Sequence, residues 1–367
     1  MYNWQYKEWP DFTYSLENIQ ELAISFAEEL GLVNGLITAL NDDLKQETLI
    51  EILISEALKT SEIEGEYMSR IDVMSSIKRN LGLNDATKVS DKRVAGVTTL
   101  MTEVRESFTT DLSIEMIQHW HKVLMDSFST IDAGQWRQGD EPMQVVSGAH
   151  GREIIHFEAP ASVDVPQEIK VFVQWFNNSE FESLDKVSRS LIKSSITHLY
   201  FESIHPFEDG NGRIGRALAE YALSYSLQSP VLLSISKVIE KNKKGYYEAL
   251  KVAQTSLEIT EWIFYFSNVI LSAQIEAKQL VEFTVKKVKF FDRFKELLNE
   301  RQLKVINRML EAGMDGFEGG MTAKKYIAIA KTSKATATRD LQYLNEIGVL
   351  NLVGAGRSVR YELIMAQ

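Results

Sequence analysis

The sequence of 367 residues contains no cysteine, which excludes disulfide bonds and thiolate metal sites. The N-terminal stretch MYNWQYKEWPDF lacks the basic and apolar regions of a signal peptide. Apolar runs such as LIEILISEAL are short and carry charges, which argues against a membrane span. We therefore expect a soluble, cytoplasmic protein that does not bind membranes.

Negative charge exceeds positive charge in the sequence, with 51 Asp and Glu against 40 Lys and Arg. The net charge of −11 argues against nonspecific binding of nucleic acid by the whole chain. The charge is nevertheless uneven: from Arg301 onward, ten Lys/Arg stand against six Asp/Glu, a balance of +4 that leaves −15 on the first 300 residues. This asymmetry predicts an acidic body and a basic C-terminal module with separate roles.

Helical periodicity is the main pattern in the sequence. One helix is predicted from about Leu44 to Glu64, where Ile50, Leu53 and Ala57 recur at i, i+3 and i+7 on one face. The segment MQVVSGAHGREIIHF, residues 143–157, differs, because two β-branched pairs flank a glycine-containing turn. The sequence therefore predicts a mainly α fold with a β-hairpin inside it.

The twelve residues HPFEDGNGRIGR, 205–216, concentrate one His, two acids, three glycines and two arginines. Glycines let the backbone approach a ligand closely, and the free N–H groups at a helix start attract anions. Arg213 and Arg216 lie on one side of the first helical turn and suit a polyphosphate better than a single carboxylate. Asp209 is placed to hold Mg²⁺ between phosphate oxygens, and His205 to accept a proton near neutral pH.

This segment resembles the motif of the Fic family, HPFx(D/E)GNGRxxR, at every fixed position. Members are chiefly adenylyltransferases, which transfer AMP from ATP to a Ser, Thr or Tyr hydroxyl of a target protein and release pyrophosphate. The resemblance implies that His205 is the general base and that Asp209 binds Mg²⁺. It implies that Arg213 and Arg216 hold the β- and γ-phosphates and that Phe207 anchors the loop. The further nucleotide-binding residues that it implies are Glu208, Gly210, Asn211, Gly212, Ile214 and Gly215.

The resemblance also gives the hairpin at 143–157 a role, as a flap that docks the target segment by strand pairing. The candidates for its nucleotide-facing strand are Ile154, Ile155, His156 and Phe157. The alternative is a hairpin that only covers the core. Downstream, Tyr246 is predicted to lie near the adenine and Gln254 to contact the nucleotide.

Glu64 shares a helical face with Ala57, seven residues earlier. A carboxylate on an apolar stripe near a helix C-terminus, before the natural stop Gly65, needs a cationic partner. The stretch from Thr60 to Gly65, TSEIEG, also resembles the inhibitory motif (S/T)xxxE(G/N) of the family. There the Glu pairs with the second motif arginine, here Arg216, and blocks the γ-phosphate position. The alternatives are a surface Glu at a helix end, or a Glu that positions water to remove AMP.

Residues 300–367 predict three helices, Glu300–Ala312, Met321–Lys331 and Lys334–Ile347, followed by a hairpin. Ser333 is a suitable N-cap for the third helix. This order resembles a winged helix-turn-helix, a fold that binds DNA or serves for protein docking and dimerisation. The residues that would contact DNA are Lys334, Thr336, Thr338 and Arg339 in the major groove, with Arg357 and Arg360 at phosphates.

The expected architecture is mainly α in three parts: an N-terminal helical region with the inhibitory helix at 1–85, a Fic core with the hairpin flap at 86–285, and a winged-helix domain at 290–367. The expected function is an autoinhibited protein adenylyltransferase that uses ATP and Mg²⁺. Its partner is a target protein with an acceptor hydroxyl, while DNA binding by the tail and a homodimer are left open. The alternatives are a nucleotide-sensing DNA-binding regulator, an enzyme that also removes AMP, and transfer of another phosphate-containing group.

Overall fold

The computed structural model describes residues 1–83, 89–140, 142–147, 154–178, 184–313 and 316–365. The chain divides into two compact units. The first comprises Met1–Leu32 and Leu49–Ala277, and the second comprises Val33–Thr48 and Lys278–Gln367. Residues of the expected N-terminal region thus fall in both units, and the three-part division stays a prediction.

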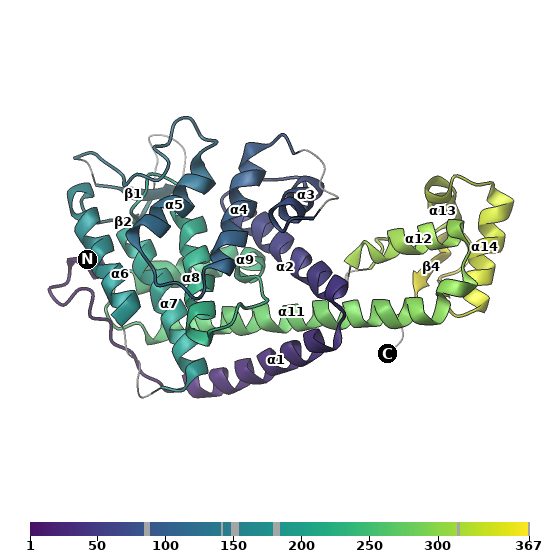
Figure 1. Ribbon diagram of the computed structural model, residues 1–367, viewed down its shortest axis with the longest axis horizontal. Coiled ribbons are helices and arrows are strands. Elements are labelled where there is room, and N and C mark those ends of the chain that lie inside the picture. Colours follow the sequence, from purple (N-terminus) through teal and green to yellow (C-terminus); the bar gives the residue numbers. More distant parts are fainter. Residues whose placement is uncertain (84–88, 141, 148–153, 179–183, 314–315, 366–367) are drawn as a thin grey trace. The chain divides into compact units, whose positions relative to one another are not determined.

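The protein is mainly helical, as predicted (Figure 1). The helices up to residue 294 are α1 (Ile19–Ala39), α2 (Asp42–Ile63), α3 (Arg70–Asn80), α4 (Lys92–Glu106), α5 (Ile114–Met125), α6 (Val165–Asn178), α7 (Lys186–Ile204), α8 (Asn211–Leu227), α9 (Ile235–Lys241), α10 (Lys243–Ala253) and α11 (Thr260–Phe294). The helix expected from about Leu44 to Glu64 is α2, whose Ile50, Leu53 and Ala57 are buried as its periodicity predicts.

The core of the first unit is built around α7 and α8, which pack side by side (Figure 1). Every residue of α7 from Ser190 to Ile204 is buried, as expected for a helix surrounded by other elements. Asp185 caps its start by accepting hydrogen bonds from the backbone N–H groups of Val187 and Ser188. Because both helices are fixed in the core, the loop between them, residues 205–210, is held at both ends.

The predicted hairpin is confirmed as two antiparallel strands, β1 (Gln144–Ser147) and β2 (Ile154–Glu158), with a bulge between Val145 and Val146. Its turn, residues 148–153, lies outside the described residues. Val145 pairs with Phe157, whose buried ring packs edge-on against Tyr2 at 5.0 Å between centroids. Trp4 Nε1 donates to the carbonyl oxygen of Glu158 at 2.7 Å. The N-terminal segment therefore packs against β2.

The second unit contains α12 (Glu300–Leu310), α13 (Ala323–Ala330), α14 (Lys334–Glu346), β3 (Leu350–Val353) and β4 (Arg360–Leu363). The strands are antiparallel, and Met321 bridges to Tyr361 beside them. This is the predicted order of elements, although the name winged helix stays a prediction. Ser333 caps α14 by accepting from the Thr336 N–H, as predicted. Along α14, Ala337, Leu341 and Leu344 are buried, and Ile347, which follows the helix, is half-buried.

A buried carboxylate joins α12, α13 and α14. Asp340 accepts hydrogen bonds from Arg301 Nε at 2.7 Å and Nη2 at 3.1 Å, and from the Tyr326 hydroxyl at 2.9 Å. Burial acts to raise the pKa of Asp340, but the hydrogen bonds from Arg301 and Tyr326 outweigh it and hold this pKa below its usual value. The carboxylate is therefore ionised and fixes α12, α13 and α14 to one another.

The helix α1 alone among the described residues is long and apolar enough, by length and composition, to cross a bilayer. The sequence reasoning missed this run because it considered only shorter, charged stretches. A single helix of this kind is weak evidence for a membrane span, since helices of soluble proteins pass the same test.

Candidate active site

The loop at 205–210 begins with a residue in a rare backbone conformation. His205 ends α7 with φ 50° and ψ 60°, in the left-handed region. Arg137, which is 3% exposed, holds it there: Nε donates to the His205 carbonyl at 2.8 Å and Nη2 to the Pro160 carbonyl at 2.6 Å. Burial lowers the pKa of Arg137 to about 10, so the guanidinium stays charged at neutral pH. Sequence reasoning missed Arg137, because no motif distinguishes it.

The middle of the loop is anchored in the core, as predicted for Phe207. Its fully buried ring stacks on His121 at 3.7 Å between centroids. The Gly134 N–H donates to Nδ1 of His121, so Nε2 carries the proton and donates to the Asp209 carbonyl at 3.1 Å. Burial lowers the pKa of His121 to about 4, so the ring is neutral near pH 7. His121 therefore has a structural role in the loop.

The side chain of Asn211 also stabilises the loop. Its Oδ1 accepts from the Phe207 N–H at 2.9 Å, and its Nδ2 donates to the Phe207 carbonyl at 2.8 Å. Gly210 precedes α8 with φ 79°, a conformation that glycine adopts without strain. The backbone N–H groups of the first turn of α8 are thus aligned as an anion site. Around them, Glu208 is exposed and Ile214 is buried in the core.

The two motif arginines are both almost completely buried. Arg216 donates from Nη2 to Glu64 Oε1 at 2.8 Å, and to Thr60 from Nε to Oγ1 at 2.9 Å and from Nη2 to the carbonyl at 3.0 Å. Burial acts to lower the pKa of Arg216, but the Glu64 carboxylate outweighs it and holds this pKa above its usual value. The cationic partner that the position of Glu64 demands is therefore Arg216, as predicted.

Glu64 follows the last residue of α2 and is placed by a regular helix stop. Gly65 has φ 82°, its N–H bonds to the Glu62 carbonyl at 3.0 Å, and the Glu66 N–H bonds to the Ser61 carbonyl at 2.9 Å. These two bonds define a Schellman motif with Gly65 at its left-handed position. A Cβ atom added at Gly212 would lie 2.5 Å from Glu64 Oε1. The Glu64 carboxylate therefore lies against the first turn of α8, in the anion site.

A second carboxylate, which sequence reasoning missed, engages the other arginine. Glu66 Oε1 lies 3.0 Å from Arg213 Nη1, with the Glu66 side chain 18% exposed and that of Arg213 2% exposed. Arg213 also contacts Met125 Sδ at 3.6 Å. The signal available in the sequence was the second acid of Glu64-Gly65-Glu66, which follows the helix stop.

The predicted site residues outside the 205–216 motif lie partly at the surface and partly in the core. In β2, Ile155 is 47% exposed, His156 is half-buried and Phe157 is buried, while the Ile154 side chain lies outside the described part. Tyr246, expected near the adenine, is 1% exposed and its hydroxyl bonds to His198 Nε2 at 2.7 Å. The exposed tyrosine of this pair is Tyr247. Gln254 is buried as well, and its Nε2 donates to the Glu202 carbonyl at 3.1 Å.

The residues at the site fit a magnesium ion that the protein binds together with substrate phosphates. Within the described ranges, no group of three or more His, Cys, Asp or Glu side chains could hold a metal by itself. Mg²⁺ is commonly bound by one or two carboxylates together with substrate phosphates. Asp209 is exposed, and one of its oxygens accepts from the Gly210 N–H at 2.6 Å. A single exposed carboxylate beside an anion site suits an ion that arrives with a polyphosphate.

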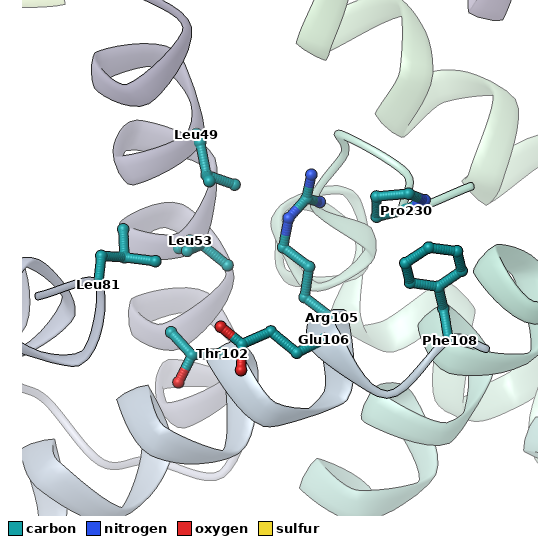
Figure 2. A pocket seen from close by; sticks show the side chains of 8 residues that line it. All are labelled: Leu49, Leu53, Leu81, Thr102, Arg105, Glu106, Phe108 and Pro230. Atoms are coloured by element: carbon teal, nitrogen blue, oxygen red, sulfur yellow. The ribbon is translucent and has the colours of Figure 1, made fainter. Parts of the chain in front are cut away.

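A cavity of about 310 Å³ lies elsewhere in the first unit (Figure 2). Leu49 and Leu53 of α2 line one side and Arg105 of α4 another, and Pro230 and Phe108 lie across from the leucines. Arg105 donates to the Val231 carbonyl at 2.5 Å. None of the predicted site residues lines this cavity.

Two family models match the chain. Residues 111–223 match the Fic/DOC family, and residues 2–83 match a domain of unknown function, DUF4172. Proteins named protein adenylyltransferase Fic from Drosophila melanogaster and Drosophila grimshawi are each 24% identical over 193 residues, 52% of this chain. The match covers 35% and 36% of those proteins, so the chain spans about a third of their length. A protein named probable protein adenylyltransferase from Aquifex aeolicus is 36% identical over 98 residues, 27% of each chain.

Solved structures show the same fold. A Fic family protein from Desulfovibrio desulfuricans has a TM-score of 0.54 and 19% identity, over 98% of this chain and 99% of its own. A Fic domain-containing signaling protein from Bacteroides thetaiotaomicron has a TM-score of 0.52 and 16% identity, over 74% of this chain and 97% of its own. Motif, family model and fold agree, and residues 111–223 of this chain form a domain of the Fic/DOC family.

Proposed function

We propose that the protein is an autoinhibited protein adenylyltransferase, which transfers AMP from ATP to a Ser, Thr or Tyr hydroxyl of a target protein and of itself. The observation that carries the proposal is the Glu64 carboxylate, bound to Arg216 at 2.8 Å against the first turn of α8. An intramolecular anion at this position indicates that the site is built for a negatively charged group. Relatives named protein adenylyltransferases support ATP as the donor.

The reaction follows from the residues around the loop. The N–H groups of α8 and the guanidinium groups of Arg213 and Arg216 bind the phosphates. His205 removes the proton of the acceptor hydroxyl, whose oxygen bonds to the α-phosphorus while the bond to pyrophosphate breaks. Mg²⁺ held by Asp209 and the phosphates would neutralise the charge that develops on the leaving group.

The inhibition has a direct electrostatic basis. Arg216 already donates to Glu64 and to Thr60, and Arg213 donates to Glu66. A phosphate that binds either arginine has to displace a carboxylate. Only the difference in free energy between the arginine–phosphate and the arginine–carboxylate interaction then contributes to binding. The resting protein therefore binds ATP without the full set of phosphate contacts that transfer requires.

The isotope label tests the reaction type. Glu64→Gly protein, shown to be folded, is incubated with Mg²⁺ and ATP labelled either at the α- or at the γ-phosphate. We expect the α-label to become covalently bound to protein and the γ-label to leave, with far less labelling of the unaltered chain and none of His205→Ala. Retention of the γ-label would indicate phosphate transfer, and equal labelling with and without Glu64 would contradict inhibition. Incubation of pre-modified protein with and without Glu64 tests whether this residue also supports AMP removal.

A second candidate function, DNA binding by the tail, rests on one observation. Lys334, Thr338 and Arg339 are exposed along α14. Thr336 is half-buried and bonds to Ser333, and Arg360 is paired with Glu362 at 2.9 Å. The Arg357 side chain lies outside the described residues. Exposed basic and hydroxyl side chains on one helix favour a role in contacting a nucleic acid.

A further inference from the structure

A buried carboxylate stands beside the proposed base and has no role in the reaction described so far. Glu202 lies on α7, three residues before His205, and its Oε2 is 3.6 Å from His205 Nδ1. The Glu202 side chain is 6% exposed and the His205 side chain 14%. A carboxylate in a fully packed helix is costly unless a partner offsets its charge. The site therefore places the Glu202 carboxylate beside Nδ1 of the His205 imidazole, where it can orient the ring.

The surroundings of Glu202 leave His205 as its partner. Among the described residues, His205 is the one Lys, Arg or His side chain with a nitrogen within 4.0 Å of the Glu202 carboxylate, and Oε1 accepts no hydrogen bond. His198 lies one turn earlier, but burial lowers its pKa, so it is neutral, and its Nε2 is bonded to Tyr246. Arg216 acts on Glu202 from α8, but its Nε and Nη2 groups donate to Thr60 and Glu64.

Helix α8 makes room for this carboxylate by means of a glycine. A Cβ atom at Gly215 would lie 2.3 Å from Glu202 Oε1 and 3.3 Å from the His198 ring. Gly215, which the motif predicts at the nucleotide, thus lets α8 approach α7 where the Glu202 carboxylate is seated. The remaining titratable groups that act on Glu202 are the hydroxyls of Tyr246 and Tyr247 on α10.

The charge state of Glu202 suits this role. Burial acts to raise its pKa, but the neighbouring His205 and Arg216 outweigh burial and hold the pKa below the usual value. The carboxylate is thus ionised at neutral pH and accepts hydrogen bonds only. It can bind the protonated nitrogen of an imidazole and cannot donate to an unprotonated one.

We propose that Glu202 is a positioning residue for the transfer reaction, which holds the Nδ1–H of His205 and leaves Nε2 as the basic nitrogen. The inference rests on the proposed function. Nε2 takes the proton of the acceptor hydroxyl while the oxygen–phosphorus bond forms and pyrophosphate leaves. The imidazolium formed in that step is stabilised by the Glu202 carboxylate and later returns its proton to solvent. The present 3.6 Å exceeds a hydrogen bond, and catalytic contacts commonly shorten once substrate is bound.

Kinetics of a charge-removing variant test the role. In the Glu64→Gly background, Glu202→Gln keeps the size of the side chain and removes its charge. We expect kcat for AMP transfer to fall about tenfold or more while KM for ATP stays within about twofold. Glu220→Gln, at a buried glutamate of α8, is the matched control and leaves kcat and KM unchanged. A kcat equal to that of the parent would overturn the inference.

Nitrogen NMR gives a readout that does not depend on activity. In protein with labelled histidines, the His205 signals are assigned by their loss in His205→Ala. We expect the neutral ring to carry its proton on Nδ1 in the unaltered protein, and to lose this preference in Glu202→Met, which offers no acceptor. A ring with its proton on Nε2 would contradict the inference. If the Glu64→Gly parent transfers no AMP, the proposed function fails, while the NMR result still decides whether Glu202 orients His205.

Discussion

At the scale of the residue, the site is controlled by charges that satisfy each other within the chain. Arg213 and Arg216 each have a carboxylate from the segment that ends α2, at 3.0 Å and 2.8 Å. Both arginines are buried, so neither could stay unpaired without a large desolvation cost. Any phosphate ligand therefore exchanges one anion for another, and in the proposed function the balance between the two sets the rate of AMP transfer.

This exchange predicts a role for Glu66 that is separate from that of Glu64. We expect Glu66→Gln to tighten ATP binding by about tenfold, because a charge-assisted bond to Arg213 no longer competes with phosphate. The Glu64→Gly, Glu66→Gln double variant should bind more tightly than either single variant. Calorimetric titration with a non-hydrolysable ATP analogue measures this, and an affinity that is the same with and without Glu66 would argue against it.

A pH effect is expected at Glu220. Burial and the neighbouring Glu56 raise the pKa of Glu220 to about 8, with Arg105 acting in the opposite direction. The folded protein therefore keeps a proton that the unfolded chain releases near the ordinary value, so this contribution to stability falls as pH rises from about 5 to about 8. Glu220→Gln should flatten that fall, which has a limit of about 1.4 kcal/mol per pH unit. Urea unfolding across this range measures the slope, and equal slopes for both proteins would refute the assignment.

Local sequence patterns identified some of these residues but not others. Periodicity placed Glu64 on a face that needs a cation, because helical spacing fixes neighbours within a helix. It could not place Glu66, which follows the helix stop and whose partner Arg213 is 147 positions away. In Tyr246-Tyr247 the two side chains point to different sides of α10, and only the surrounding fold decides that Tyr246 is the buried one.

At the scale of the element, the end of α2 determines where the Glu64 carboxylate lies. The Schellman motif directs Glu64 and Glu66 from one turn to two different arginines. The Lys243 ammonium also donates to the Ile63 carbonyl, which the helix itself leaves unsatisfied. The proposed inhibition thus depends on the geometry of a helix terminus as well as on the acids.

Gly65→Ala tests this dependence. A side chain at φ 82° costs about 1 to 2 kcal/mol, since L-residues other than glycine rarely adopt this region. We expect a lower melting temperature and an auto-modification rate between those of the unaltered chain and Glu64→Gly, because Glu64 is displaced without being removed. Gly31→Ala, in α1 with no atom within 4 Å of the added Cβ, is the control. If the Gly65→Ala protein is destabilised but its auto-modification rate equals that of the unaltered chain, the inhibition does not depend on the helix stop.

At the scale of the whole molecule, an acidic unit and a basic tail are joined in one chain. The order of helices and strands in the tail was predictable, because amphipathic spacing, the Ser333 cap and glycine turns are local signals. The division into units was not, since residues 33–48 belong with the tail and are far from it in sequence. Within residues 33–48, the side chains of Val33 and Leu40 cluster with Val281 of α11, a contact that no local sequence pattern reveals.

DNA binding by the tail gives a prediction for the full chain. If α14 lies in a groove, Lys334→Ala and Arg339→Ala should each weaken binding and reduce the slope of log K against log salt by about one. Lys45→Ala, a surface lysine paired with Asp42, is the control. Gel-shift titrations at several salt concentrations measure the slopes. Binding that is absent, or that is insensitive to both residues, would favour a role of the tail in protein contacts over DNA binding.

The proposed function requires that Glu64 occupies the position at Arg216 that the nucleotide needs for transfer. Intact-mass spectrometry tests it most directly, on the unaltered chain, Glu64→Gly, and Glu64→Gly with His205→Ala, each incubated with ATP and Mg²⁺. We expect one or more added AMP groups on Glu64→Gly, with little on the unaltered chain and none on the double variant. Equal masses for all three folded proteins, or AMP on the variant without His205, would contradict it.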